Sequence, residues 1–474
     1  MSQAAYNEQR IAHWDAVASR WKRRGGAGKY YHRRLARIYR FLVSPGMKVL
    51  ELGCGSGDLL AGLAPGTGVG VDFSPLMIAA ARARHPDLTF VCADVSDLDL
   101  HDTFDVIILS DLINDVWDAQ NVLEAVSRHA TRDTRIMMNF YSRVWEMPLR
   151  LAQALRLARP LRLQNWLTPD DVRNLMNLSG LEPIRQWLEI LLPVPIPLVS
   201  SFANRFLAKL WPLRLLDLSN FIVARSKPQQ DAGVPGPSVS VIVPARNEAG
   251  NIPDIFARVP EMGAGTELVF VEGHSRDDTY AAIQREIARH PQRRCQLLRQ
   301  AGTGKGDAVR LGFEQARGDI FMILDADLTV PPEDLPRFYR AFVAGNGELV
   351  NSVRLVYPME KQAMRYLNFL GNKFFSLVFS MLLGQPTKDT LGGTKVLGRR
   401  HYLRIRENRA YFGDFDPFGD FDLIFGAAKA NFKIVDLPVR YRERVYGTTN
   451  IQRWKHGWLL LKMVVVAAGR IKFF

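Results

Sequence analysis

The sequence predicts an α/β protein of two domains, each built on its own sheet. The chain has 474 residues, more than one ordinary domain contains. Short apolar strands alternate with helical patterns on both sides of residues 227–237. That segment is rich in Pro, Gly and Gln and has no hydrophobic period, which is typical of a linker. We therefore expect domains at residues 1–226 and 238–474, joined by residues 227–237.

Composition and charge restrict the class of protein. Apolar residues make up 47% of the chain and charged residues 23%, which predicts folded cores. The three cysteines lie far apart without CxxC spacing, which disfavours disulfides and zinc and favours the cytosol. The net charge of +14 indicates an anionic partner. No stretch approaches the roughly 18 consecutive apolar residues of a membrane span.

In the first half, four short apolar segments predict strands, at residues 47–52, 68–71, 88–93 and 104–109. The helical patterns between them favour a parallel sheet covered on both faces. A basic, amphipathic stretch at residues 149–163 predicts a helical insertion before the last strands.

A glycine-rich loop follows the first of these strands. Residues 51–57 read ELGCGSG, and glycines there let a ligand approach the backbone at the start of a helix. The spacing is not the GxGxxG of dinucleotide-binding loops. Asp72 ends the second strand, where a carboxylate can accept ribose hydroxyls, and Asp94 ends the third, within reach of an adenine amine. Ligands of open α/β sheets bind at this carboxyl edge.

These motifs, with FDVIILSDLIND at residues 104–115, resemble the class I S-adenosylmethionine-dependent methyltransferases. The resemblance implies a Rossmann-like sheet that transfers a methyl group from S-adenosylmethionine to an acceptor the sequence does not identify. It also implies a set of cofactor contacts, at Glu51, Gly53, Gly55, Gly57, Asp72, Phe73, Asp94, Val95 and Ser110. Ser110 and Asp111 would face the methyl group, and Asn114 stands where many related enzymes have histidine.

The second half has its own series of strands, predicted at residues 239–243, 268–271, 296–298 and 320–324. The last ends in Asp325-Ala326-Asp327. Carboxylates two residues apart on a strand point the same way, so both can face one ligand. Oxygen ligands at a strand end suit Mg²⁺ or Mn²⁺ together with diphosphate oxygens. We expect Asp325 and Asp327 to be the metal ligands.

Two further polar segments precede this triplet. The loop at residues 302–306 reads GTGKG, and its Lys305 can hold a diphosphate, although the spacing is not that of a Walker A loop. Residues 275–279 include Asp277, which can cap a helix as well as bind a ligand.

The order VIVPARNE, VFVEGHSRDDT, GTGKG and ILDAD resembles the inverting GT-A glycosyltransferases of family 2. The similarity is greatest to the polyprenyl- or dolichyl-phosphate mannose and glucose synthases. It implies a GT-A sheet and a nucleotide-diphosphate sugar donor, held by Pro244, Ala245, Glu248, Glu272, Asp277, Lys305, Asp325, Ala326 and Asp327. The family usually has DDGS where this chain has EGHS, which leaves the choice between uracil and guanine open.

The same resemblance implies an acceptor site for a polyprenyl or dolichyl phosphate. Arg354 would contact the acceptor phosphate, and Arg365 would be a second such contact. Asp422 resembles a later aspartate of the family, and these residues with Asp327 form the expected catalytic set. Residues 413–422 contain four acids, and the alternative for them is a capped loop before a helix.

Two segments predict contact with a membrane surface. Residues 364–383 and 440–474 combine apolar residues at helical spacing with lysine and arginine, which suits helices in a headgroup layer. Alternatively, both helices cover the enzyme's own core or a partner protomer. We expect a bifunctional cell-envelope enzyme, peripheral on the inner face of the cell membrane, with no nucleic-acid partner.

Two alternatives stay open. The glycosyl acceptor would be a hydroxyl of a surface polysaccharide or glycolipid, in which case Asp422 or Asp420 would serve as base. The other alternative is a nucleic-acid-binding methyltransferase, which the high charge permits. Against it, the basic residues cluster with apolar helices rather than with a base-stacking platform.

Overall fold

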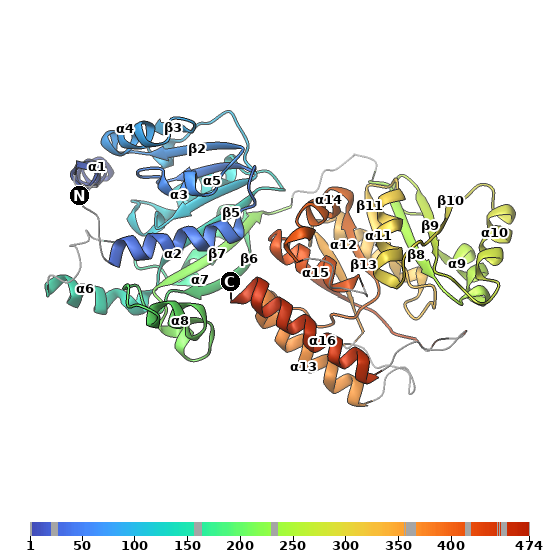
Figure 1. The fold of residues 1–474 in the computed structure, drawn as a ribbon. Coiled ribbons are helices and arrows are strands. Elements are labelled where there is room, and N and C mark those ends of the chain that lie inside the picture. Colours follow the sequence, from blue (N-terminus) through green and yellow to red (C-terminus); the bar gives the residue numbers. More distant parts are fainter. Residues whose placement is uncertain are drawn as a thin grey trace. The chain divides into compact units, whose positions relative to one another are not determined.

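The computed structural model describes residues 2–19, 27–155, 164–228, 236–354, 356, 366–412, 419–442, 444, 446 and 453–473. For residues 27, 366–370 and 453–457 it describes the backbone only. The chain divides into two compact units, Met1–Lys227 with Phe473–Phe474, and Pro228–Lys472. In its described part each unit contains one seven-stranded sheet with helices on both faces (Figure 1). The predicted α/β class with two separate sheets is confirmed.

The first unit alternates strands and helices along most of its length. Its strands are β1 (Lys48–Leu52), β2 (Thr67–Asp72), β3 (Thr89–Cys92), β4 (Val106–Ser110), β5 (Arg135–Tyr141), β6 (Leu181–Glu189) and β7 (Ser219–Ser226). Its α-helices are α1 (Gln3–Ser19), α2 (Ala27–Leu42), α3 (Asp58–Gly62), α4 (Pro75–Arg84), α5 (Ala119–Arg128), α6 (Glu146–Ala154), α7 (Pro169–Leu178) and α8 (Val199–Arg205). The 3₁₀ helices used below are η2 (Val95–Asp97), η4 (Arg143–Trp145), η5 (Leu207–Lys209) and η6 (Leu213–Leu216).

The strand order of the first sheet is β3-β2-β1-β4-β5-β7-β6. The first five strands in this order are parallel neighbours; β1 to β4 were predicted, and β5 was not. By contrast, β7 runs antiparallel to both β5 and β6. Consecutive neighbouring strands can pair antiparallel without a crossover helix, and only short helices lie between β6 and β7. The helix predicted at residues 149–163 begins earlier, as α6, and residues 156–163 lie outside the described part.

Apolar residues cover both faces of this sheet. On one face, Ile107 and Leu109 of β4 lie in a buried core with Val122 of α5 and Val172 of α7. On the other face, the ring of Tyr39 in α2 packs against Phe221 of β7, with 5.9 Å between centroids. These layers hold the carboxyl ends of β1, β2 and β4 at one edge of the sheet.

The second unit begins with the same alternation. Its strands are β8 (Val239–Ala245), β9 (Thr266–Glu272), β10 (Arg294–Arg299), β11 (Ile320–Ile323), β12 (Leu349–Val353), β13 (Lys395–Gly398) and β14 (Ile434–Pro438). Its α-helices are α9 (Ile252–Arg258), α10 (Thr279–Arg289), α11 (Lys305–Gln315), α12 (Leu335–Val343), α13 (Tyr366–Leu383), α14 (Arg399–Glu407), α15 (Asp420–Lys429) and α16 (Arg453–Ala467).

The strand order of the second sheet is β10-β9-β8-β11-β13-β12-β14. The strands from β10 to β11 are parallel, and β13 runs antiparallel to both of its neighbours. On one face, Phe270 stacks on Phe256 of α9 at 5.3 Å, inside a core shared with α10 and α12. On the other face, the ring of Phe313 in α11 packs against Phe321 of β11 and Tyr402 of α14. The ring centroids are 5.1 and 4.8 Å apart.

Helices α13 and α16 keep apolar side chains at the surface of the second unit. Leu377 of α13 is 73% exposed, and Trp458 of α16 is 74% exposed. None of the helices in the described part of the chain combines the length and apolar composition needed to cross a bilayer.

Candidate functional site

The glycine loop of the first unit lies between β1 and α3. Gly53, Gly55 and Gly57 have φ angles of 71°, 51° and 71°, in the left-handed region that favours glycine. A Cβ on Gly57 would lie 2.6 Å from the ring of Phe90, so this glycine is required by packing. A Cβ on Gly55 would meet nothing within 4 Å. The backbone beside Gly55 is therefore open to a ligand.

Two buried carboxylates fix this loop. Asp72, at the end of β2, accepts hydrogen bonds from the backbone N–H of Gly55 and of Ser74, both at 2.9 Å. Burial raises the pKa of Asp72, and these two bonds oppose the rise. Each carboxylate oxygen keeps a lone pair for a ribose hydroxyl. Glu51 accepts from the N–H of Leu60 at 3.0 Å, and burial raises its pKa to about 8.

The remaining predicted cofactor positions lie at the same edge of the sheet. Phe73 directly follows β2, and Val95 opens η2 and is buried. Asp94 precedes Val95, and its Oδ1 accepts from the N–H of Ser96 at 2.9 Å, which caps η2. Ser110 ends β4.

Helix α1 crosses this edge, a contact that was not predicted from the sequence. Asn7 Nδ2 donates to Asp94 Oδ2 at 2.7 Å, so the carboxylate expected to meet adenine already has a partner. Arg10 forms an ion pair with Asp115, and Trp14 Nε1 donates to the same carboxylate at 2.8 Å. Side chains that can donate hydrogen bonds, at positions 7, 10 and 14, share one helix face, a pattern visible in the sequence.

Asp111 follows β4 in a strained conformation. Its φ is 56°, which is uncommon for a residue other than glycine. Its Oδ1 accepts from the hydroxyl of Tyr31 at 2.8 Å and from Asn139 Nδ2 at 2.6 Å. Within the described residues, Oδ2 carries no hydrogen bond, and burial raises the pKa of Asp111 to about 7. By contrast, Asn114 is fully buried and donates to the carbonyl of Asn165 at 2.7 Å, which is a structural role.

The first acidic group of the second unit lies where β8 and β9 end. Pro244 and Ala245 close β8, and Ala245 pairs in register with Glu272, the last residue of β9. Glu272 accepts from the N–H of Ser275, which shapes the turn after β9.

Asp277 ties this turn to the loop after β8. It accepts from the N–H of Thr279 at 3.1 Å and from the N–H of Ala249 at 3.3 Å. Burial alone would raise its pKa, but a hydrogen bond from the hydroxyl of Thr279, together with these two backbone bonds, lowers it. Asp277 therefore bonds the first N–H of α10, which supports a structural role for it, although the N-cap position itself is Asp278.

Arg444 joins two of the predicted site acids. Its guanidinium lies 2.9 Å from Glu248 Oε1 and 2.8 Å from Asp327 Oδ2. Burial raises the pKa of Glu248 to about 7, although Arg444 opposes the rise. Arg444 was not predicted from the sequence, in which the basic run RYRER at residues 440–444 is the only hint.

Lys305 and Asp325 form the next pair, with 2.6 Å between Nζ and Oδ1. Lys305 begins α11, and its ammonium lowers the pKa of Asp325 against the effect of burial. A Cβ on Gly393 would lie 1.9 Å from Asp325 Oδ2, so any larger residue at position 393 would displace this carboxylate. Ala326, between the two aspartates, is buried.

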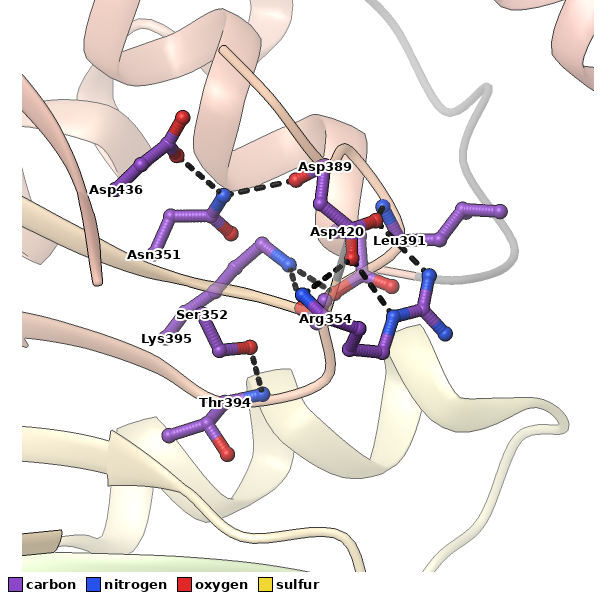
Figure 2. A network of polar contacts seen from close by, with 10 residues as sticks. Asn351, Ser352, Arg354, Asp389, Leu391, Thr394, Lys395, Asp420 and Asp436 are labelled. Carbon is purple, nitrogen blue, oxygen red and sulfur yellow. Dashed lines mark hydrogen bonds and ion pairs between the residues drawn. The ribbon is translucent and has the colours of Figure 1, made fainter. Parts of the chain in front are cut away.

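Arg354 lies after β12 in a bidentate ion pair with Asp389. The two distances are 2.7 Å from Nε and 2.9 Å from Nη2 (Figure 2). The guanidinium lowers the pKa of Asp389 against the effect of burial. Asn351 Nδ2 donates to the carbonyl of Asp389 at 2.8 Å and to Asp436 Oδ1 at 2.9 Å. These bonds hold the loop that contains Asp389 against β12 and β14.

The two acids of α15 also have cationic partners. Asp420 pairs with Lys395 at 2.7 Å, and Asp422 pairs with Arg409 at 2.9 Å. All ten residues of α15 are buried. Arg365, the second predicted phosphate contact, lies outside the described residues, as do residues 413–418.

The predicted metal ligands fit a cation that arrives with its nucleotide. In the part of the chain that the structure describes, no three His, Cys, Asp or Glu side chains gather to hold a metal. Mg²⁺ is commonly held by one or two carboxylates together with substrate phosphates. Asp325 and Asp327 can supply such a partial set, and each has a cationic side chain that a diphosphate could take over.

Comparison with known proteins gives a family for each unit. The "Methyltransferase domain" model matches residues 43–177, and the "Glycosyl transferase family 2" model matches residues 240–405. A dolichol-phosphate mannosyltransferase of Pyrococcus furiosus is 34% identical over 219 residues, covering 45% of this chain and 59% of that protein. An undecaprenyl-phosphate 4-deoxy-4-formamido-L-arabinose transferase of Pseudomonas aeruginosa is 34% identical over 120 residues, covering 24% and 35%.

The chain spans less than two thirds of the length of these curated relatives. Among solved structures, the magnesium protoporphyrin IX methyltransferase of Synechocystis is 16% identical with a TM-score of 0.33. That similarity covers 47% of this chain and 97% of the solved one.

Proposed function

This chain carries an N-terminal methyltransferase domain and a C-terminal glycosyl transferase family 2 domain, and we propose that the second transfers a hexose from a nucleotide-diphosphate sugar to a polyprenyl phosphate. One observation carries the proposal. Glu248, Asp325 and Asp327 converge with Lys305 and Arg444 at the carboxyl ends of β8 and β11. The names of the two curated relatives, a dolichol-phosphate and an undecaprenyl-phosphate sugar transferase, support the choice of acceptor.

The donor's diphosphate would lie between Lys305 and Arg444. Both cations are held in place by acids before the donor binds, so their positions are fixed. Mg²⁺ or Mn²⁺ at Asp325 and Asp327 would offset the charge on the departing nucleotide diphosphate. Glu272 and Asp277 would hold the nucleoside from the end of β9.

The acceptor's phosphate would be positioned by Arg354. A phosphate oxygen attacks the anomeric carbon, and the bond from that carbon to the nucleotide diphosphate breaks with inversion. The phosphate is already anionic, so the reaction needs no strong base. Asp420 and Asp422 both sit in ion pairs, which favours this acceptor over a sugar hydroxyl. The exposed apolar residues of α13 and α16 support peripheral contact with the inner face of the cell membrane.

The test uses the full chain with Mg²⁺, a polyprenyl phosphate and a panel that includes UDP-glucose and GDP-mannose. We expect mass spectrometry to detect a lipid-linked hexose with one donor. Asp327→Asn should abolish the product, while Asp254→Asn, at an exposed aspartate of α9, should not. Absence of lipid-linked product with every donor would contradict the proposal.

For the first unit we propose methyl transfer from S-adenosylmethionine. The open backbone at Gly55 and the carboxylate of Asp72 support a site for the cofactor's methionine and ribose. Asp111 would face the methyl group, with Oδ2 available to an acceptor. Calorimetry should detect S-adenosylmethionine binding that Asp72→Ala removes and Asp99→Ala, at an exposed aspartate, keeps. Equal affinity in the Asp72→Ala protein would exclude this site.

A further inference from the structure

The first unit has an apolar surface that neither proposed reaction explains. It is formed by η4 and α6 together with residues 190–218, which connect β6 to β7; we call it the β6–β7 surface. Its most exposed apolar side chains are Leu198 at 87%, Trp211 at 73% and Met147 at 71%. Leu151, Phe202 and Leu216 are each more than half exposed. Several large apolar side chains exposed on neighbouring elements suggest an interaction site.

The two segments belong to one surface. Trp145 Nε1 donates to the carbonyl of Leu216 at 2.7 Å, which joins η4 to η6. The N–H of Ser142 donates to the carbonyl of Leu218 at 2.7 Å. The exposed side chains therefore come from elements that hydrogen bonds hold together.

Hydrogen bonds also attach this surface to α2 and to the segment after β6. Asn204 of α8 donates to the carbonyl of Leu192 at 2.8 Å and to the hydroxyl of Tyr30 at 3.1 Å. Arg34 of α2 donates to the carbonyl of Asn204 at 3.0 Å. The apolar side chains thus project from a tethered scaffold.

Leu198 shows that this exposure has a cost. Its φ is 60° and its ψ −46°, and the N–H of Val199 donates to the carbonyl of Pro197 across it, which is a strained γ-turn. Burial of the side chain does not offset this strain, because Leu198 is the most exposed large apolar side chain among the described residues. Backbone strain that the fold itself does not use points to a function.

The charges of the surface identify its partner. Within residues 190–218, Arg205 and Arg214 are exposed, whereas Lys209 is buried in an ion pair with Glu189 and Asp217 is buried as well. Arg143 and Arg214 are both exposed beside the apolar side chains. A second copy of a chain with net charge +14 would bring like charges together. Anionic head groups attract such residues, while tryptophan and leucine enter the boundary with the acyl chains.

We propose that the β6–β7 surface docks the methyltransferase unit on the anionic face of a lipid bilayer. The surface adjoins the end of the sheet where methyl transfer would occur. Ser219 follows it directly, and its Oγ lies 3.1 Å from the hydroxyl of Tyr31, which donates to Asp111. A methyl acceptor carried by a lipid would therefore approach Asp111 from the docked side.

The test places an environment-sensitive NBD label at position 198 of the full chain. The protein carries Leu198→Cys with Cys92→Ser, since Cys92 is the exposed native cysteine. The matched control carries Leu178→Cys instead, at a leucine of α7 that is 62% exposed. Vesicles are phosphatidylcholine alone or with about one third phosphatidylglycerol, in low and high salt.

We expect a several-fold fluorescence gain and a blue shift at position 198 with anionic vesicles only, weakened by salt, and no change at position 178. No response at position 198 overturns the proposal, as does an equal response at both positions. An apolar signal at position 198 before vesicles are added also overturns it, because protein then covers the surface. Hexosyl transfer to detergent-dispersed polyprenyl phosphate is measured separately, so each proposal can fail alone.

Discussion

Lys395 and Asp420 form an ion pair in the interior of the second unit, with 2.7 Å between Nζ and Oδ1. The Lys395 ammonium also donates to the carbonyl of Gly392, which precedes Gly393, where a Cβ would collide with Asp325. The pair therefore connects α15 to the loop that shapes the proposed donor site.

Removing one partner of this pair should destabilise the second unit. Lys395→Met leaves the Asp420 carboxylate buried without its cation, which costs about 3–5 kcal/mol. Lys395→Met with Asp420→Leu should recover most of that loss, because no buried charge remains. Urea unfolding of both variants measures the difference. Equal losses in the two variants would show that the pair contributes through packing alone.

Arg444 should govern donor affinity. Arg444→Ala removes a cation expected to face the diphosphate and leaves Glu248 and Asp327 without their shared partner. A charge-assisted contact of about 1.5–3 kcal/mol corresponds to a Kd higher by roughly 10- to 100-fold. Calorimetry with a nucleotide diphosphate and Mg²⁺ provides the measurement. Arg294→Ala, at an exposed arginine of β10, is the control, and an unchanged Kd for Arg444→Ala would refute the role.

Two glycines of the first unit should respond differently to alanine. Gly57→Ala combines left-handed strain with a collision against Phe90, so it should be the more destabilising change. Gly55→Ala carries the strain alone, about 1 kcal/mol, because its Cβ meets open space. That space is where the cofactor would bind, so Gly55→Ala should weaken S-adenosylmethionine binding. Thermal unfolding and calorimetry on both variants test the contrast, and full affinity in Gly55→Ala would contradict it.

Glu51 should make the stability of the first unit depend on pH. Its pKa is raised to about 8 in the folded state by burial, from an ordinary value of 4.5. The folded state then binds more protons than the unfolded state, so stability falls as pH rises from about 5 to 8. Glu51→Gln should remove up to a few kcal/mol of this dependence. Hydrogen exchange in peptides that cover β1 and β2 reports it, and an unchanged pH profile in the variant would exclude Glu51 as the source.

The sequence predicted features that depend on local patterns. Apolar strands and the glycines after β1 are specified within a few residues, so the two sheets and the loop at Gly55 could be anticipated. The partners of the site acids could not. Arg444 lies 117 residues beyond Asp327, and Asn7 lies 87 residues before Asp94. Such contacts depend on how the chain folds back, which no local period records.

Strand direction shows the same limit. Short apolar segments predicted β1 to β4 and β8 to β11 in the right places, but periodicity carries no direction. The antiparallel placement of β13 between β11 and β12 brings Gly393 against Asp325 and Lys395 against Asp420. The arginine partner of Asp389 was anticipated as a phosphate contact, yet nothing in the sequence indicated that the two side chains would pair.

The pairing of acids with cations in the proposed donor site has a thermodynamic consequence. Asp325 and Asp327 each have a cationic partner in Lys305 or Arg444. A divalent cation alone would compete with those partners, and a nucleotide diphosphate alone would draw them from the acids. When both ligands bind, the acids meet the metal and the cations meet the diphosphate, so no charge is left unpaired. Metal and nucleotide should therefore bind synergistically, each raising the affinity for the other by the same factor.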